Sequence, residues 1–400
     1  LFLYLNNIGV GKPLLGIQNH MIPLQQPQVP FGHQQEAVSL DHDDEGLAGN
    51  VQFCDHPAVP GALFPQDDPL QIDVLFVLQC RGTQNENIAV FEHHIAPGYL
   101  IFRAVDLVLD KAQNEKEMLY DKEGEIEVTK DIQYTENPEW QKHCGIDLYR
   151  KKCDGPQPVL FYTHGGGFDA GRKYHRRGMA TWMAKTGICV VNVDFGLSPI
   201  FTFKETLHMI TEAANWVVDH ADEYNFDLSK VMVGGDSSGG WCALYMLDLS
   251  TDETLHEQLG IPALRLKPNA AYLNCGMYDL RKMLHTFPVA PVSGVLTYDT
   301  MGYGKRTFEQ SPDKELISPI NFVNANFPRT LFLSYSKWDA LCYGQTQNLM
   351  KRLDALGVPY EEFHSTNPLQ NHCFMFNWAE GQCMENNTRV WNFIKKFVES

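Results

Sequence analysis

The stretch Val231–Tyr245 reads V-M-V-G-G-D-S-S-G-G-W-C-A-L-Y, and the rest of the chain can be interpreted outward from it. Its first three residues form an apolar run typical of a buried parallel strand, and from Ser238 onward the apolar residues recur at helical spacing. Between these halves G-D-S-S-G matches the pattern G-x-S-x-G, which predicts a tight strand-to-helix turn with Ser237 at its tip. The serine backbone in such a turn is strained, so glycine on both sides is a physical requirement.

This pattern alone does not establish a function. At ordinary glycine and serine usage, about one chain in ten of this length would contain it by chance. A glycine-rich loop between a strand and a helix is therefore the competing interpretation, and a catalytic serine needs support from other parts of the chain.

The composition limits the kinds of partner. The chain has 400 residues, of which 44% are hydrophobic and 20% charged, as in a globular protein of one large domain or two ordinary ones. A net charge of -17 without a basic block argues against nucleic acid or an anionic membrane as a partner. The opening L-F-L-Y-L is too short for a signal-peptide core, and no run of about eighteen apolar residues occurs, so we expect no membrane association. A homodimer is compatible with this composition.

The cysteines favour a reducing compartment. Ten cysteines are scattered along the chain without a C-x-x-C pair, and several lie inside apolar runs, where a thiol acts as a small hydrophobic group. We therefore expect free thiols and a cytoplasmic protein.

Residues 1–117 differ from the remainder of the chain. Up to Asp110 they contain three basic and thirteen acidic residues, and they contain no motif that indicates a function. One interpretation is an accessory domain, in which residues 99–113 supply a wall of the pocket. We favour an N-terminal extension, disordered or not native to the protein, with Met118 as a natural start.

From Met118 the sequence alternates between strand and helix patterns. The expected strands are 125–134, 146–149, 159–163, 188–195, 231–233, 270–275, 330–335 and 361–364, and the expected helices are 203–224, 343–356 and 388–398. This alternation predicts one catalytic domain over residues 118–400, with a mostly parallel twisted sheet covered by helices on both faces. The alternation of strands and helices is interrupted at residues 276–319, which are rich in Met and aromatic residues. This segment is either a small cap insertion over a pocket or an ordinary loop that packs on the rest of the domain.

An acid and a histidine follow the serine turn. A serine hydroxyl becomes a good nucleophile when an imidazole removes its proton, and a carboxylate must orient that imidazole. Asp339 follows the strand 330–335 and His372 follows the last short strand, so both should reach the edge of the sheet where Ser237 lies. Asp279 also follows a strand and competes for the role of the acid, whereas Asp354 is expected to be solvated in a helix and His364 to pack within its strand.

A glycine-rich loop, His164-Gly165-Gly166-Gly167-Phe168, follows the strand 159–163. The tetrahedral intermediate of acyl transfer carries a negative oxygen, and each backbone N–H aimed at it lowers the barrier by about 3–4 kcal/mol. Backbone can approach so closely only where side chains are absent, and the amide of Ser238 points into the same space. A phosphate cradle would need a following Lys-Ser/Thr or a second spaced glycine set, and neither is present.

Together these motifs resemble the hormone-sensitive-lipase-like branch of the α/β-hydrolase esterases, which includes bacterial carboxylesterases and arylacetamide deacetylase. The resemblance extends from about Glu125 to the C-terminus. It depends on H-G-G-G-F at 164–168, G-D-S-S-G-G at 235–240, Ser318-Pro319, Asp339-Ala340-Leu341, Leu356-Gly357-Val358 and His372-Cys373-Phe374.

The resemblance implies an α/β-hydrolase fold with a cap and assigns a role to each motif residue. The implied roles are Ser237 as nucleophile, His372 as base, Asp339 as the acid that orients it, the amides of Gly166, Gly167 and Ser238 as oxyanion hole, and His164, Gly165 and Phe168 as substrate-binding residues. The chain also departs from the family. Residues 195–200 read F-G-L-S-P-I where the family usually has Y-R-L-A-P-E, Cys373 replaces a glycine, and two N-terminal cap helices cannot be located. These departures concern the shape of the pocket and leave the residues that carry the chemistry in place.

The sequence therefore predicts a serine carboxylic-ester hydrolase that cleaves short-chain acyl esters through an acyl-enzyme, with no metal or organic cofactor. An arylformamidase-like amide hydrolase is the nearest alternative, because the same groups attack a formyl amide. A non-catalytic receptor on this fold, such as the plant gibberellin receptor, is a weaker alternative. That receptor lacks the catalytic histidine, whereas this chain has His372.

Overall fold

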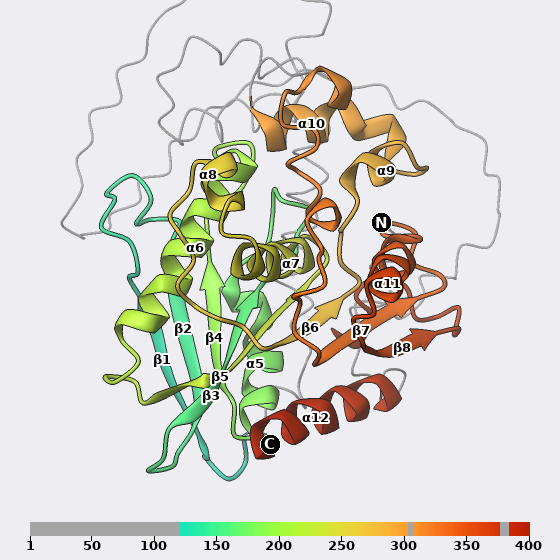
Figure 1. The fold of residues 1–400 in the computed structure, drawn as a ribbon. Helices are drawn as coiled ribbons and strands as arrows, with labels where there is room; N and C mark the ends of the chain where they lie inside the picture. The colour runs from blue at the N-terminus through green and yellow to red at the C-terminus, as the bar shows by residue number, and fades with distance from the viewer. Residues whose placement is uncertain (1–120, 303–306, 377–383) are drawn as a thin grey trace, which may run out of the picture. The chain divides into compact units, whose positions relative to one another are not determined.

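The computed structural model describes residues 121–302, 307–376 and 384–400 (Figure 1). The predicted N-terminal extension and the expected start at Met118 lie outside these ranges. The strands are β1 (Ile126–Ile132), β2 (Gly145–Lys151), β3 (Gln157–Thr163), β4 (Cys189–Asp194), β5 (Phe226–Asp236), β6 (Ala270–Asn274), β7 (Leu331–Ser336) and β8 (Glu361–Ser365). The α-helices are α5 (Arg177–Ala184), α6 (Phe203–Asp219), α7 (Ser238–Thr251), α8 (Leu255–Leu259), α9 (Leu280–Leu284), α10 (Ser293–Met301), α11 (Gln345–Leu356) and α12 (Met384–Glu399).

All eight strands belong to one sheet, in the order β1-β2-β4-β3-β5-β6-β7-β8. The first two neighbouring pairs, β1 with β2 and β2 with β4, are antiparallel. Every later pair is parallel, from β4 with β3 to β7 with β8. The predicted mostly parallel sheet is confirmed, and the parallel order brings the carboxyl ends of β3, β5, β7 and β8 to one edge.

The structure also contains helices that the pattern did not predict. Helix α5 has only eight residues and includes Gly178, so its helical signal is weak in the sequence. The helix expected over 203–224 ends at Asp219, where a His220 ring nitrogen lies 2.9 Å from the carbonyl oxygen of Trp216 and the two rings stack. The sequence pattern therefore missed short helices and misplaced the end of a long one.

The two faces of the sheet contribute to two separate hydrophobic layers. In β3, Phe161 packs in one layer with α6 and α7, whereas its neighbour Leu160 packs in the other layer with α5 and α12. Val233 and Met232 of β5 divide in the same way, because successive side chains of a strand point to opposite faces. A strand buried on both faces must be apolar throughout, which explains the continuous apolar runs in the sequence.

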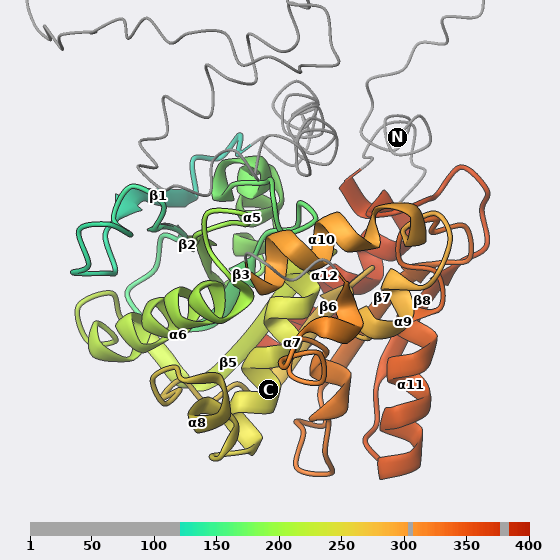
Figure 2. The same cartoon turned by 90° about the horizontal axis from the view of Figure 1, so that it is seen from above.

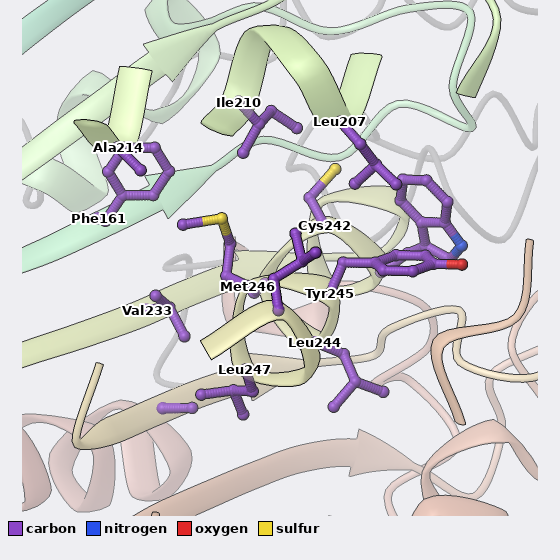
Figure 3. Packing of buried hydrophobic residues seen from close by; sticks show 14 of the residues in the cluster. Phe161, Leu207, Ile210, Ala214, Val233, Cys242, Leu244, Tyr245, Met246 and Leu247 are labelled. Carbon is purple, nitrogen blue, oxygen red and sulfur yellow. The ribbon is translucent and has the colours of Figure 1, made fainter. Parts of the chain in front are cut away.

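Helix α7 lies inside the first of these layers. Figure 3 shows Met246 of α7 between Ile210 of α6 and Val233 of β5, with Cys242 and Tyr245 of the same helix below Leu207 of α6. A helix that is apolar on every side is a core helix, so α7 holds the residue before it, Ser237, on a rigid support. Of the helices in the described ranges, none is both long and apolar enough to cross a bilayer.

Residues 276–319 leave the sheet at the carboxyl end of β6 and form α9, α10 and short 3-10 turns. Figure 1 shows α9 and α10 together beyond that end of the sheet. Among the Met, Leu and aromatic side chains of this segment, Met277, Tyr278, Met283, Leu284 and Tyr298 are buried. Phe287 instead is 82% exposed, and Tyr303 lies outside the described residues. A side chain of α11 holds the start of the segment, because Gln345 Oε1 accepts hydrogen bonds from the amides of Tyr278 and Asp279 at 2.9 and 2.7 Å.

Candidate active site

Ser237 occupies the turn between β5 and α7, as the sequence predicted. Its φ of 54° and ψ of -122° lie in a region that residues with a side chain rarely adopt, so the turn stores strain. A Cβ atom on Gly235 would lie 2.2 Å from the carbonyl oxygen of Gly239, which confirms the physical need for glycine on the two sides of the serine.

The structure brings Ser237, His372 and Asp339 together from three different strand ends. His372 Nε2 lies 2.9 Å from Ser237 Oγ, and His372 Nδ1 lies 3.0 and 2.9 Å from the two carboxylate oxygens of Asp339. Asp339 Oδ1 also accepts hydrogen bonds from the amides of Leu341 and Cys342, which fix the carboxylate. All three triad side chains are buried. An imidazole held in this way can accept the serine proton and carry the resulting charge beside a carboxylate.

The other two acids and the other histidine that the sequence offered have partners outside the triad. Asp279 caps α9 and accepts a hydrogen bond from the amide of Lys282 at 3.0 Å. Asp354 is exposed and accepts from the hydroxyl of Tyr360. His364 stacks on the ring of Tyr335 with 4.5 Å between ring centroids. Each of these residues therefore has a local partner other than Ser237 or His372.

The glycine-rich loop packs directly on the serine turn. A Cβ atom on Gly165 would lie 2.4 Å from the carbonyl oxygen of Asp236 and 2.8 Å from Ser237 Cβ, so only glycine allows this approach. The amides of Gly166 and Gly167 donate no hydrogen bond to any acceptor within the part of the chain that the structure describes. The amide of Ser238 opens α7, where the first N–H groups of a helix have no partner inside the helix. These three donors are available to a ligand oxygen.

His164 and Phe168 flank the glycines. The His164 ring is buried and stacks on Phe195 with 4.5 Å between centroids. Burial, and then the positive charge of Arg176, lowers the pKa of His164 to about 3, so the ring is neutral at physiological pH. Phe168 meets the edge of Trp241 at 5.3 Å and lines a small cavity with Trp241 and Ser238.

A buried ion pair behind the serine was missed by the sequence analysis. Arg176 donates to Asp236, from Nε to Oδ1 at 2.8 Å and from Nη2 to Oδ2 at 2.6 Å, and the hydroxyl of Tyr162 donates to Oδ1 at 2.9 Å. Burial raises the pKa of Asp236, but the charge and hydrogen bonds of Arg176 outweigh this and hold the pKa below its usual value. Arg176 has no motif around it, and the only hint in the sequence was the missing arginine in residues 195–200.

Two residues of the triad, together with Cys275, are also residue types that can bind a metal ion. Ligand atoms of Cys275, Asp339 and His372 lie within 4.8 Å of one another. Since His372 and Asp339 already bind each other, an ion there would compete with the hydrogen bond that orients the imidazole. The geometry therefore fits a hydrogen-bonded triad better than a metal centre.

A mostly parallel sheet with a strained serine at the β5–α7 turn and an acid and a histidine after β7 and β8 defines an α/β-hydrolase fold. The chain belongs to the BD-FAE family, whose model matches residues 146–353. An esterase of Gibberella moniliformis is 33% identical over 243 residues, which cover 59% of this chain and 74% of that protein. An esterase of Fusarium pseudograminearum is 31% identical over 202 residues, covering 47% of this chain and 59% of its own length. An acetyl esterase of Salmonella schwarzengrund is 35% identical over 94 residues, which cover 22% of this chain and 29% of the relative.

Solved structures share the fold over most of the described chain. Esterase B of Lactobacillus rhamnosis has a TM-score of 0.62 at 19% identity and covers 75% of this chain and 97% of its own. A bacterial heroin esterase has a TM-score of 0.59 at 20% identity, covering 76% and 93%. The predicted resemblance to α/β-hydrolase esterases is confirmed.

Proposed function

We propose that the protein is a serine hydrolase that cleaves carboxylic esters through an acyl-enzyme. The observation that carries the proposal is the chain of hydrogen bonds from Ser237 through His372 to Asp339, at distances of 2.9 and 2.9 Å. Membership in a family with relatives named as esterases supports the same reaction.

Each step uses a group already in place. Ser237 Oγ attacks the ester carbonyl carbon while its proton passes to His372 Nε2, and Asp339 stabilises the imidazolium. The carbonyl oxygen becomes an oxyanion that accepts hydrogen bonds from the amides of Gly166, Gly167 and Ser238, each worth about 3 kcal/mol. The C–O bond then breaks, His372 returns the proton to the leaving alkoxide, and a water molecule releases the acid by the same route.

Short acyl chains are the substrates that we propose. The cap segment 276–319 is short, and its aromatic and Met side chains fill space that a long chain would need. The cavity between Phe168, Ser238 and Trp241 measures only about 10 Å³, enough for one water molecule. Phe168 would form the wall of the pocket that contacts the acyl group, and His164 and Gly165 would support that wall.

Three further parts of the proposal concern the cellular location, the cofactors and the domain boundaries of the enzyme. All seven cysteines in the described ranges are free, which supports a cytoplasmic location. The reaction needs only side chains and backbone amides, so we propose no metal or organic cofactor. We also propose that residues 118–400 form the catalytic domain and that 276–319 are its cap, with 1–117 as an extension.

The alternative reactions separate in a substrate panel. An arylformamidase would turn over N-formyl aromatic amides faster than acyl esters, although both use the same attack by Ser237. A non-catalytic receptor would turn over neither. The contact of His372 with Ser237 argues against the receptor, because that interpretation depends on a missing histidine.

Covalent labelling of Ser237 tests the proposal directly. A fluorophosphonate should add one phosphonyl group to Ser237, detected by mass spectrometry of the labelled peptide, and abolish ester hydrolysis. Ser237→Ala should prevent both the label and turnover. Ser238→Ala is the matched control, because it removes a neighbouring buried hydroxyl but keeps the backbone amide. Labelling that persists in Ser237→Ala would overturn the assignment.

A further inference from the structure

Two buried carboxyl groups, one of them in the glycine-rich loop, lack hydrogen-bond partners within the described residues. Asp169 is 8% exposed and Asp299 is 2% exposed. Within the described residues, none of their four carboxyl oxygens takes part in a hydrogen bond. Buried polar atoms are nearly always paired in folded proteins, so each exception needs a physical reason.

Other buried carboxylates near the site do have partners. Asp236 is paired with Arg176, and Asp147 accepts a hydrogen bond from Lys173 Nζ at 2.6 Å. Asp248 of α7 is also unpaired, but the acidic residue beside it, Asp252, lies at the end of the same helix and accepts hydrogen bonds from Thr254. Asp169 and Asp299 differ from it because they occur together, on two segments that are far apart in the sequence.

The two carboxyl groups lie on the glycine-rich loop and on the cap segment 276–319. Asp169 follows Phe168 directly, in the loop whose Gly165 packs on Ser237. Asp299 lies on α10, which Figure 2 shows over the middle of the sheet when the molecule is seen from above. The carboxyl groups are close enough that burial and then the charge of Asp299 raise the pKa of Asp169 well above its usual value.

Both segments also meet the same connection between β4 and α6. The carbonyl oxygen of Phe168 accepts a hydrogen bond from the amide of Ser198 at 3.0 Å. On the other side, a Cβ atom on Gly302, directly after α10, would lie 3.3 Å from Thr202 Cγ2. The two carboxyl groups thus lie on segments that meet the same connection, and one of these segments, the glycine-rich loop, packs on Ser237 through Gly165.

We propose that Asp169 and Asp299 form a subsite for the primary ammonium group of an ester substrate. The inference rests on the proposed ester hydrolysis and names the chemical class that this site would prefer. An ammonium group has three N–H donors, the two carboxyl groups supply acceptors, and the positive charge of a bound ammonium group would favour their ionised form. A divalent metal needs more oxygen ligands than these two side chains offer. In the described ranges the only cluster of three metal-ligand residues is the one at the triad.

Two esters of equal size test the preference. The cationic probe is 4-(aminomethyl)phenyl acetate, and its neutral counterpart is 4-ethylphenyl acetate. 4-(2-Aminoethyl)phenyl acetate extends the reach of the ammonium group by one carbon. We expect the wild-type enzyme to have a kcat/KM about tenfold to a hundredfold higher for one of the two cationic esters than for the neutral ester.

The variants Asp169→Asn and Asp299→Asn should lower this ratio, and together they should reduce it to about one. The asparagine side chain keeps the shape and removes the charge. Asp248→Asn is the matched control, a buried unpaired carboxyl group outside the proposed subsite, and should leave the ratio unchanged. Equal kcat/KM values for all three esters on the wild-type enzyme would overturn the proposal.

A binding measurement separates the subsite from the reaction. Ser237→Ala protein should bind benzylamine in a calorimetric titration, and the added Asp169→Asn and Asp299→Asn changes should abolish that binding. If no ester is cleaved but benzylamine binds in this way, the proposed reaction is wrong and the subsite stands. Lys305 and Arg306 lie outside the described residues, so the titration is repeated with both replaced by alanine. Benzylamine binding only in that variant would mean that the chain itself supplies the cation, and the proposal would be wrong.

Discussion

Replacing Arg176 by methionine should destabilise the protein more than any surface change of the same kind. The methionine side chain fills much of the same volume but removes both hydrogen bonds to Asp236, which is 0% exposed. Removing one partner of a buried ion pair leaves an unpaired charge and costs about 3–5 kcal/mol. Because Asp236 directly precedes Ser237, the serine should also shift, and a displacement of about 1 Å can lower the rate by about a hundredfold.

Urea unfolding and ester kinetics measure the two effects. Arg177→Met is the matched control, since Arg177 is the next residue and lies over the Tyr174 ring at 3.9 Å instead of pairing with a carboxylate. It should cost less than about 1 kcal/mol. The double variant Arg176→Met/Asp236→Asn should recover much of the lost stability, because it removes the unpaired charge.

The stability contributed by the ion pair of Arg176 and Asp236 should depend on pH. The lowered pKa of Asp236 means that the pair stabilises the protein above the ordinary pKa of a carboxyl group. This contribution disappears as the pH falls through the lowered pKa, so the wild-type and Arg176→Met proteins should converge in stability in strong acid. An unfolding free energy for Arg176→Met within 1 kcal/mol of that for Arg177→Met at neutral pH would refute the reasoning.

Further predictions concern the acid, the acyl pocket, the buried pair and the N-terminal part. Asp339→Asn should lower kcat by about ten-thousandfold, as expected when an imidazole loses its orienting carboxylate, whereas Asp279→Asn should have little effect; the reverse order would mean that the acid is misassigned. Acetyl and butyryl esters of one alcohol should give higher kcat/KM values than esters longer than about ten carbons, and the opposite trend would exclude a filled cap. Burial raises the pKa of Asp299 to about 7, so stability should fall as the pH rises from about 4 to 7. The melting temperature of Asp299→Asn relative to the wild type should therefore increase from pH 5 to pH 8, and a constant difference would argue against an ionisable carboxyl group there. A chain that begins at Met118 should match the full chain in melting temperature and in KM for short esters; a lower melting temperature together with a raised KM would identify residues 1–117 as part of the cap.

The sequence by itself determined that the sheet is mostly parallel, where its strands lie in the chain, and the position of Ser237. Strands buried on both faces must be apolar throughout, so 159–163, 270–275 and 330–335 could be recognised without tertiary information. The serine turn was equally clear, because the close approach at Gly235 leaves no room for a side chain. Asp339 and His372 could be placed from their positions after strands, since parallel strands bring their carboxyl ends to one edge.

Only the tertiary structure showed which of the competing acids lies beside His372 and which charges surround the site. Asp279 and Asp339 both follow strands, and the choice depends on hydrogen bonds, to Lys282 in one case and to His372 in the other. Arg176 has no pattern of its own, because its partner Asp236 is 60 residues away in the sequence. Asp169 and Asp299 are separated even further and look like ordinary surface residues in the sequence. Contacts between distant residues depend on how the loops and the cap pack, and the spacing of residues along the chain does not specify that packing.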